Sequence, residues 1–226
     1  MAAMATEDSA PAGVTVVIPC RNEAEALPGV LAAVPAGYRA IVVDNSSTDT
    51  TATVATEHGA RVVTETLPGY GAAVQAGIAA AGTEFVAVLD GDGSMDPREL
   101  PGLVAAVRAG ADLAVGRRRP VTRGAWPWHT RLGNGVVARR LRRRYGLPVH
   151  DIGAMRVARR GRLESLGHLH DRYGYPLELL VRAAAADWVV REIDISYRPR
   201  TGGESKISGS ALGSLRATRD FLRVLR

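Results

Sequence analysis

Five short apolar runs alternate with helix-like segments between residues 14 and 116, and this alternation constrains the fold more than any other feature. The runs are VTVVIP (14–19), AIVVD (40–44), ARVV (60–63), EFVAVLD (84–90) and ADLAVG (111–116). Short runs rich in β-branched residues are typical of strands, and the segments between them repeat apolar residues with helical spacing. Continuous apolar strands separated by helices predict an α/β fold with a mostly parallel sheet flanked by helices.

After residue 117 this rhythm breaks, and the rest of the chain is expected to extend the same domain. The sequence predicts a basic loop at 117–124, helices at 128–146 and 176–186, an edge strand at 188–199 and a closing amphipathic helix at 210–226. A strand-like end follows HDIGA in the segment 149–157. Residues 1–13 are expected to form a flexible tail, which leaves 14–226 as a single domain.

Charge and cysteine content limit the classes of partner and compartment. A formal net charge of +6 implies attraction to anions, which include nucleic acid, anionic membrane surfaces and phosphorylated small molecules. Only 5% of the residues are aromatic and no stacking platform is apparent, which disfavours a nucleic-acid binder. Cys20 is the only cysteine, no apolar run reaches the length of a membrane span, and the start does not resemble a signal peptide. We therefore expect a cytoplasmic protein.

Three aspartates follow the fourth predicted strand in VAVLDGDGSMDP (86–97). Ligands of parallel sheets bind beyond the carboxyl ends of the strands, so Asp90, Asp92 and Asp96 should share that edge with residues 19–23 and 44–47. A solvated turn is the simpler interpretation. Clustered carboxylates at a buried strand end, however, repel one another and favour a bound divalent cation. The intervening glycines are expected to leave room for a diphosphate, and Asp96 to cap the next helix ahead of Pro97.

Four segments in this order and spacing resemble glycosyltransferase family 2: VTVVIPCRNEAEAL, AIVVDNSSTDTT, GYGAAVQAGI and FVAVLDGDGSMDP. The later segments HDIGAMRV, YGYPLELLVRAA and YRPRTGGESKISG resemble the branch that glycosylates polyprenyl phosphates, such as dolichyl-phosphate mannose and glucose synthases. The resemblance covers about residues 14–210. It implies an A-type glycosyltransferase fold in which 14–116 binds a nucleotide-diphospho-sugar and 117–226 forms the acceptor side.

The resemblance also implies roles for individual residues. Nucleotide-sugar binding would fall to Pro19, Arg21, Glu23, Asp44, Gly71, Asp90, Asp92 and Glu178. Asp44 would accept a hydrogen bond from the base, and Asp92, with Asp90 second, would bind Mg²⁺ or Mn²⁺. Acceptor and diphosphate binding would fall to Arg117, Arg131, Arg198, Arg200, Ser205 and Lys206. Asp92, Asp151, Arg156 and Lys206 would be the catalytic set.

The second half favours a phosphate as the nucleophile of an inverting hexosyl transfer. A hydroxyl acceptor needs a base, and relatives that use one supply a carboxylate, typically from a Glu-Asp pair. No such pair occurs in the second half, where Asp151 is the only well-placed substitute. A phosphate is already ionised and needs cations, which this arginine-rich half supplies. The predicted reaction therefore moves a hexose from UDP-glucose or GDP-mannose to a phosphate acceptor such as polyprenyl phosphate.

Two alternatives stay open at this point. One is transfer to a soluble hydroxyl acceptor with Asp151 as the base. The other is a sugar-phosphate nucleotidyltransferase, although CRNEAEAL is not the glycine-rich basic loop expected after the first strand of such an enzyme. RRLRRR (139–144) and the closing helix are expected either to be solvated basic faces or to contact the inner face of a membrane peripherally.

Overall fold

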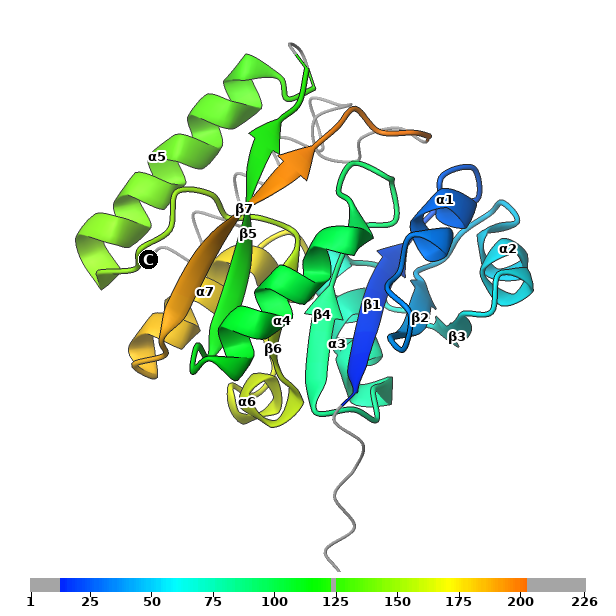
Figure 1. Ribbon diagram of the computed structural model, residues 1–226, viewed down its shortest axis with the longest axis horizontal. Coiled ribbons are helices and arrows are strands. Elements are labelled where there is room, and N and C mark those ends of the chain that lie inside the picture. The colour runs from blue at the N-terminus through cyan, green and yellow to red at the C-terminus, as the bar shows by residue number, and fades with distance from the viewer. Residues whose placement is uncertain (1–12, 123–124, 203–226) are drawn as a thin grey trace, which may run out of the picture.

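The computed structural model describes residues 13–122 and 125–202. Within these residues the chain forms one seven-stranded sheet in the order β3-β2-β1-β4-β6-β5-β7, with helices on both faces (Figure 1). The strands are β1 (Val14–Cys20), β2 (Arg39–Asp44), β3 (Arg61–Thr64), β4 (Phe85–Val88), β5 (Leu113–Pro120), β6 (Arg156–Arg159) and β7 (Val190–Tyr197). The helices are α1 (Leu27–Ala32), α2 (Thr51–Glu57), α3 (Tyr70–Ala80), α4 (Leu100–Arg108), α5 (Trp128–Tyr145), α6 (Arg160–Ser165) and α7 (Tyr175–Ala185), and the short 3-10 helix η1 (Pro97–Glu99) precedes α4.

The predicted α/β fold with a mostly parallel sheet is confirmed. Strand β1 pairs in parallel with β2 and β4, β2 pairs in parallel with β3, and β5 pairs in parallel with β7. Only β6, among the described strands, runs the other way, because it is antiparallel to both β4 and β5. A strand from the second half of the chain thus lies between two strands of the first half, so both halves belong to one domain.

Alternating side chains of the buried strands build two cores on opposite faces of the sheet. Val17 and Val43 face the core beneath α3, α5 and α7, whereas Val16 and Ile18 face the core beneath α1 and α4. Figure 1 shows the same two layers of helices. Strands covered on both faces are apolar throughout, which is why five of them stand out in the sequence.

The segment 117–124 differs from the predicted loop. Its first part, Arg117–Pro120, extends β5 and pairs in register with Asp194–Tyr197 of the edge strand β7. Arg119 forms an ion pair with Asp194 at 2.9 Å, so charge on the neighbouring strand compensates this polar end of β5. The edge strand predicted at 188–199 is confirmed as β7.

Four sequence predictions fall outside the described residues: Ser205, Lys206, the closing helix at 210–226, and the flexible tail, of which only Gly13 is described. The predicted helix at 128–146 is confirmed as α5 and ends at Gly146, whose φ is 67°. Within the described part of the chain, no helix combines the length and the apolar character needed to cross a bilayer.

Gly77 of α3 tests the packing of the helix against the sheet. A Cβ there would lie 2.3 Å from Val17 Cγ1, whereas a Cβ at Gly102 of α4 would meet nothing within 4 Å. We expect Gly77→Ala to lower the free energy of unfolding by about 1–3 kcal/mol through overpacking. Gly102→Ala should instead raise it by up to about 1 kcal/mol, because alanine favours the helix. Urea denaturation measures both, and a Gly77→Ala protein as stable as the wild type would contradict this packing.

Candidate active site

The carboxyl ends of the parallel strands meet at one edge of the sheet, at the top of Figure 1. The chain changes direction across the sheet between β1, which leads on to β2 and β3, and β4 on its other side. This switch point is where α/β sheets bind ligands. Because β6 runs in the opposite direction, the residues that lead into it, 149–155, also lie at this edge. Segments 20–24, 89–96, 149–155 and 198–202 therefore converge there.

Asp92 is an almost fully buried acidic group of this edge, with only 2% of the residue exposed. Its Oδ1 accepts a hydrogen bond from the backbone N–H of Ser94 at 2.9 Å. Its Oδ2 lies 3.0 Å from Nη2 of Arg200, in the segment that follows β7. The backbone N–H of Thr201 also donates to the Asp92 carbonyl at 3.0 Å, so segment 198–202 is fastened onto the aspartate loop.

Asp90 lies beside Asp92 and is the most strongly perturbed carboxyl group. Burial, and next the charge of Asp92, raise its pKa to about 6, against the opposing effect of Arg156, Arg200 and Arg118. Its Oδ1 is buried and makes no hydrogen bond within the described residues. The two aspartates thus form a concentrated negative site that arginines from three other segments compensate only in part.

Arg156 is the buried cation beneath this pair. It begins β6, and only 3% of the residue is exposed. Its Nη2 donates to the carbonyl of Ile152 at 2.8 Å, whereas Nε and Nη1 find no hydrogen-bond partner among the described residues. Burial raises the pKa of the neighbouring Tyr70 and Tyr175 hydroxyls, to about 12 for Tyr175, and the Arg156 charge acts against this rise in both. Both phenols therefore stay neutral around the arginine.

The two glycines of the Asp-Gly-Asp-Gly sequence are required because other residues of the protein lie too close for a side chain. A Cβ at Gly91 would lie 2.5 Å from Oε2 of Glu23 and 2.6 Å from the Cys20 sulfur. Gly93 has a φ of 73°, and a Cβ there would lie 2.5 Å from Oγ1 of Thr201. The prediction that these glycines leave room for a diphosphate was therefore wrong, because protein atoms occupy the space beside them.

Asp96 has the capping role predicted for it. Its Oδ1 accepts a hydrogen bond from the backbone N–H of Arg98 at 3.1 Å, directly after Pro97. The Arg98 side chain also bonds both oxygens of Asp96 and holds the pKa of this carboxyl below its ordinary value. Arg198, expected at the acceptor side, lies 3.7 Å from Asp96.

On the predicted nucleotide side, a network of hydrogen bonds joins the loops after β1 and β2. Pro19 pairs with Val43 inside the sheet, Arg21 is exposed, and Asp44 ends β2 with its Oδ1 bound by the Ser47 N–H at 3.1 Å. Asn22, with a φ of 55°, receives the Thr48 N–H at 2.7 Å. Further bonds tie Glu23 to Thr51, Ala24 to Asp49, and the Asn45 side chain to Glu65, Leu67 and Gly69.

Gly71 and Glu178, both predicted to bind the nucleotide-sugar, have structural partners elsewhere. A Cβ at Gly71 would lie 2.0 Å from the carbonyl oxygen of His170, so this glycine permits close packing of α3 on segment 170–171. Glu178 accepts a hydrogen bond from the backbone N–H of His170 and forms an ion pair with Arg182 at 2.7 Å. These contacts account for a buried glycine and a part-buried carboxylate without a ligand.

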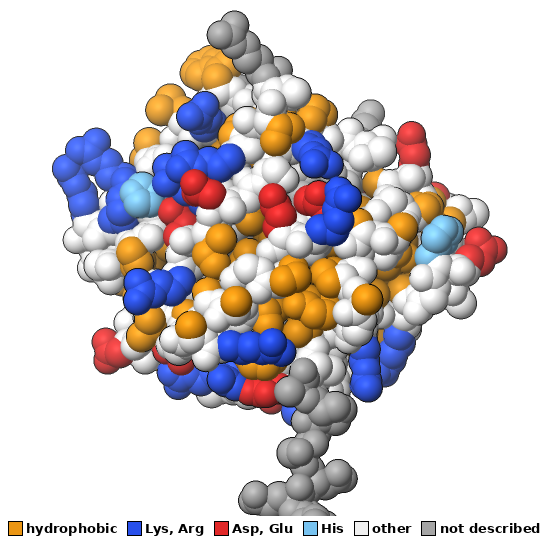
Figure 2. Space-filling model, in the orientation of Figure 1, with side chains coloured by type: hydrophobic (Ala, Val, Ile, Leu, Met, Phe, Trp, Pro, Cys, Tyr) orange, Lys and Arg blue, Asp and Glu red, His pale blue; other side chains and the backbone are white. Residues whose placement is uncertain are grey.

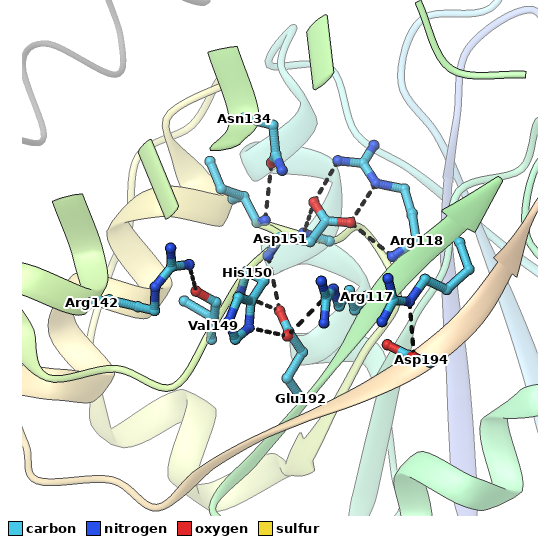
Figure 3. Close-up of polar contacts among 12 residues, drawn as sticks. Arg117, Arg118, Asn134, Arg142, Val149, His150, Asp151, Glu192 and Asp194 are labelled. Carbon is cyan, nitrogen blue, oxygen red and sulfur yellow. Dashed lines mark hydrogen bonds and ion pairs between the residues drawn. The ribbon is translucent and has the colours of Figure 1, made fainter. Parts of the chain in front are cut away.

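Asp151, which is buried, and Arg118, which is part-buried, form a pair on the predicted acceptor side (Figure 3). Arg118 Nη2 and Nε donate to the two carboxylate oxygens of Asp151 at 2.7 and 2.8 Å, and the Arg118 backbone N–H adds a third bond. Burial alone would raise the pKa of Asp151, but these bonds hold it below its ordinary value. The Arg118 guanidinium also lies 4.0 Å from the ring centre of Trp126, which packs beside Tyr197.

Glu192 of β7 organises the segment next to this pair. It accepts hydrogen bonds from the backbone N–H groups of His150 and Asp151 and from Nδ1 of His150 (Figure 3). Arg117, predicted to bind acceptor or diphosphate, lies 3.9 Å from the same carboxylate. Arg131, predicted with it, is exposed on α5. Figure 2 shows acidic and basic side chains side by side across this end of the molecule.

Sequence reasoning missed Arg118, Glu192 and Asn45. Arg118 lay in a polar run that resembled a loop, and the strand alternation of Arg117, Arg118 and Arg119 was the only local signal of its inward direction. Glu192 belonged to a predicted strand, but its partners are 41 and 42 residues away in the chain. Asn45 lay in the range 44–47 expected at this edge, but its three backbone contacts depend on the path of residues 65–69.

Asp90 and Asp92 fit a divalent cation by their chemistry. Carboxylate oxygens are preferred ligands of Mg²⁺ and Mn²⁺, and the unsatisfied Oδ1 of Asp90 is available to bind one. Within residues 13–122 and 125–202, no group of three or more His, Cys, Asp or Glu side chains is placed to hold a metal. The protein would thus supply two carboxylates, and a bound diphosphate and water would complete the coordination.

Comparisons with known proteins identify relatives over nearly the whole chain. The profile described as Glycosyl transferase family 2 matches residues 15–167. An uncharacterised glycosyltransferase of Mycobacterium tuberculosis is 64% identical over 212 residues, which cover 94% of this chain and 97% of that protein. A polyprenol monophosphomannose synthase of Mycolicibacterium smegmatis is 35% identical over 215 residues, which cover 86% of this chain and 81% of that protein.

A solved structure shares the fold. The crystal structure of glucosyl-3-phosphoglycerate synthase from Mycobacterium tuberculosis, in complex with Mn²⁺, UDP-glucose and phosphoglyceric acid, matches with a TM-score of 0.77. The match covers 95% of this chain and 80% of that one at 23% sequence identity. The predicted A-type glycosyltransferase architecture is thereby confirmed.

The raised pKa of Asp90 predicts a distinctive effect of pH on stability. Its value of about 6 exceeds the ordinary 3.8, so folding favours the protonated acid. The metal-free protein should lose stability as the pH rises from about 4 to 6, by up to about 3 kcal/mol from this group. Asp90→Asn should therefore raise the free energy of unfolding at pH 7 and change it little at pH 4.

Asp96→Asn is the matched control, since Arg98 lowers the pKa of Asp96. That stabilisation is present at pH 7 and is lost as the pH falls, so the variant should lose about 1 kcal/mol at pH 7. Denaturant titrations at the two pH values measure both effects. An Asp90→Asn protein less stable than the wild type at pH 7 would contradict this prediction. It would show that the arginines stabilise the Asp90 carboxylate more than burial destabilises it.

Proposed function

The chain belongs to glycosyltransferase family 2, and from this premise we propose that it transfers a hexose, with inversion, from a nucleotide-diphospho-sugar to a polyprenyl phosphate. UDP-glucose and GDP-mannose are the proposed donors. Two relatives support these choices, since one is a polyprenol monophosphomannose synthase and the other was crystallised with UDP-glucose.

The state of Asp151 is the observation that carries the choice of a phosphate acceptor. Transfer to a hydroxyl requires a base within reach of the proton, with a carboxylate oxygen available to receive it. Both oxygens of Asp151 are bound by Arg118, and its pKa is below the ordinary value. A phosphate monoester at neutral pH is already an anion and needs no base. In this proposal Asp151 positions Arg118, which offers positive charge at the acceptor side.

In the proposed reaction, an oxygen of the acceptor phosphate attacks the anomeric carbon from the side opposite the departing diphosphate. The new carbon–oxygen bond forms as the bond to the nucleotide β-phosphate breaks, and the bonding electrons leave with the nucleoside diphosphate. No proton is removed. Asp90 and Asp92 would hold a divalent cation, which supplies charge neutralisation at the leaving group when bound.

Arginines at the switch point would stabilise the remaining negative charge. Arg200 reaches Asp92 from the segment after β7, so it lies where a diphosphate on the aspartates would be within its range. Arg156 is buried beneath Asp90 and would keep this carboxylate ionised and oriented. Oriented charges in a site shielded from water stabilise a departing anion without reorganisation at the moment of reaction. Lys206, proposed for the same role, lies outside the described residues.

A soluble phosphate-bearing acceptor is the second candidate. The structural relative was crystallised with phosphoglyceric acid, which carries a phosphate and no lipid. The same arginines suit either acceptor. A lipid acceptor is preferred here because the relative named polyprenol monophosphomannose synthase is the more similar in sequence, at 35% identity against 23%.

The donor and metal assignment is testable by thermal shift. We expect one of the UDP-, GDP- or dTDP-sugars to raise the melting temperature only when Mn²⁺ or Mg²⁺ is present. Asp92→Asn should abolish the metal-dependent part of the shift, because half of the proposed ligand set is lost. Asp96→Asn is the matched control and should keep the shift, since Asp96 caps the 3-10 helix after the site. A metal-dependent shift that survives Asp92→Asn would remove Asp92 from the metal site.

The acceptor assignment is testable with the donor so identified. Polyprenyl phosphate should be glycosylated, whereas the corresponding polyprenol should not. In Asp151→Asn, the initial rate per folded molecule should stay within about tenfold of the wild type, because a catalytic base contributes about 10²–10⁴. Glycosylation of neutral alcohols alone, or a loss above a hundredfold in folded Asp151→Asn, would restore the hydroxyl mechanism. Preference for phosphoglyceric acid would favour the soluble acceptor.

A further inference from the structure

Helix α5 carries large apolar side chains on the face that points away from the sheet. Leu132 is 61% exposed and Val136 62% exposed, and Trp128, four residues before Leu132, is 76% exposed. Because they are four residues apart, these three side chains lie on one side of the helix. We call Trp128, Leu132 and Val136 the outer stripe. Ala138 and Leu141, on the other side, are fully buried. The outer stripe contains half of the large apolar residues that are exposed in the described part of the chain.

The outer stripe continues into positive charge along the helix. Arg139 and Arg143 follow Leu132 at helical spacing, are exposed, and complete the outward face. The whole of α5 contains six arginines and no acidic residue: Arg131, Arg139, Arg140, Arg142, Arg143 and Arg144. Figure 2 shows blue side chains gathered on the side of the molecule that carries α5. Arginines in a last turn suit the helix dipole, but this does not account for Arg139 or for the apolar stripe.

We propose that α5 is a docking surface for an anionic phospholipid bilayer. The outer stripe would enter the boundary between headgroups and acyl chains, and Arg139 and Arg143 would bind the phosphates. An apolar face with tryptophan beside arginines is the pattern of helices that lie in a membrane interface. Each basic residue near such a surface strengthens the attraction to it. At 18 residues, α5 is long enough to lie along the surface over roughly 27 Å.

The positive charge of α5 favours a bilayer over two other partners, a second copy of this chain and the segment 203–226. A second copy of this chain would bring its own six arginines to the contact. The segment 203–226 carries five Lys or Arg residues and two acidic residues, so it is also repelled. An anionic lipid surface is complementary to both parts of the outward face.

The position of α5 connects this surface to the site. Asn134, on α5, accepts a hydrogen bond from the backbone N–H of Ile152 at 3.1 Å, next to Asp151 (Figure 3). Arg142 donates to the carbonyl of Val149 at 2.7 Å. The helix is thus fastened at two points to segment 149–155, which borders the proposed acceptor side. The inference rests on the proposed function, because docking would bring a lipid phosphate to Arg118.

Vesicle sedimentation tests the surface without donor or acceptor. The full chain should bind vesicles of phosphatidylcholine with 30% phosphatidylglycerol, and not pure phosphatidylcholine. Leu132→Ser combined with Val136→Ser, and separately Arg139→Gln combined with Arg143→Gln, should each weaken binding about tenfold or more. Val189→Ser and Arg191→Gln are matched controls, because both residues are exposed and lie outside α5, so these variants should bind as the wild type does. Far-ultraviolet circular dichroism checks that each variant is folded.

Three outcomes would overturn the proposal. The first is no binding to anionic vesicles, and the second is binding unchanged in both double variants. The third is that iodide quenches the tryptophan fluorescence of the lipid-free wild type no more than that of the Trp128→Phe variant. This result would mean that segment 203–226 or a second copy of the chain covers the outer stripe. Sedimentation velocity distinguishes these two covers.

Transfer assays separate this inference from the proposed function. With a short, water-soluble polyprenyl phosphate, the Leu132→Ser, Val136→Ser variant should match the wild type. With a long polyprenyl phosphate in anionic vesicles, its rate should fall about as much as its vesicle binding. Vesicle binding by a wild type that transfers to neither acceptor would refute the proposed function and leave the docking surface standing.

Discussion

Two negative charges held at the end of a buried strand are the constraint on which the rest of this structure depends. All four residues of β4 are buried, so the chain that follows it has little freedom, and Asp90 and Asp92 cannot separate or turn to solvent. Their repulsion is offset by cations that come from β5, β6 and the segment after β7. The later strands of the chain and the segment after β7 therefore supply the positive charge that partly offsets the repulsion between Asp90 and Asp92.

The acceptor side follows the same rule of compensation across strands. Arg118 of β5 is held in place by both oxygens of Asp151, and Glu192 of β7 receives two backbone N–H groups and a histidine. Each of these groups is fixed by two or more bonds. Such fixed polar groups suit a reaction in which an anion attacks and another departs, because the site does not need to rearrange as charge moves between them.

The parts that the sequence predicted are local, and the parts that it did not predict depend on which strands are neighbours. The strands β1, β2 and β4 and the first part of β5 form apolar runs because both faces are covered, and Asp96 caps a turn within three residues of itself. The position of Asp90 and Asp92 followed from the rule that parallel strands end together. In contrast, nothing in the apolar pattern indicates that β6 enters between β4 and β5. The partners of Asp151 and Glu192 follow from that order and from the loops it brings together.

The reversed strand β6 also determines how this enzyme fold can be divided. It lies between β4 and β5, hydrogen-bonded to both, although it comes from the later half of the chain. Cutting the chain between the halves would expose an apolar edge on β4 and remove Arg156 from beneath Asp90. The two halves of the chain are thus interwoven, and neither can be exchanged as a cassette between family members. Under the proposed function, a new acceptor preference has to arise by substitution in the loops and in α5, with the sheet left whole.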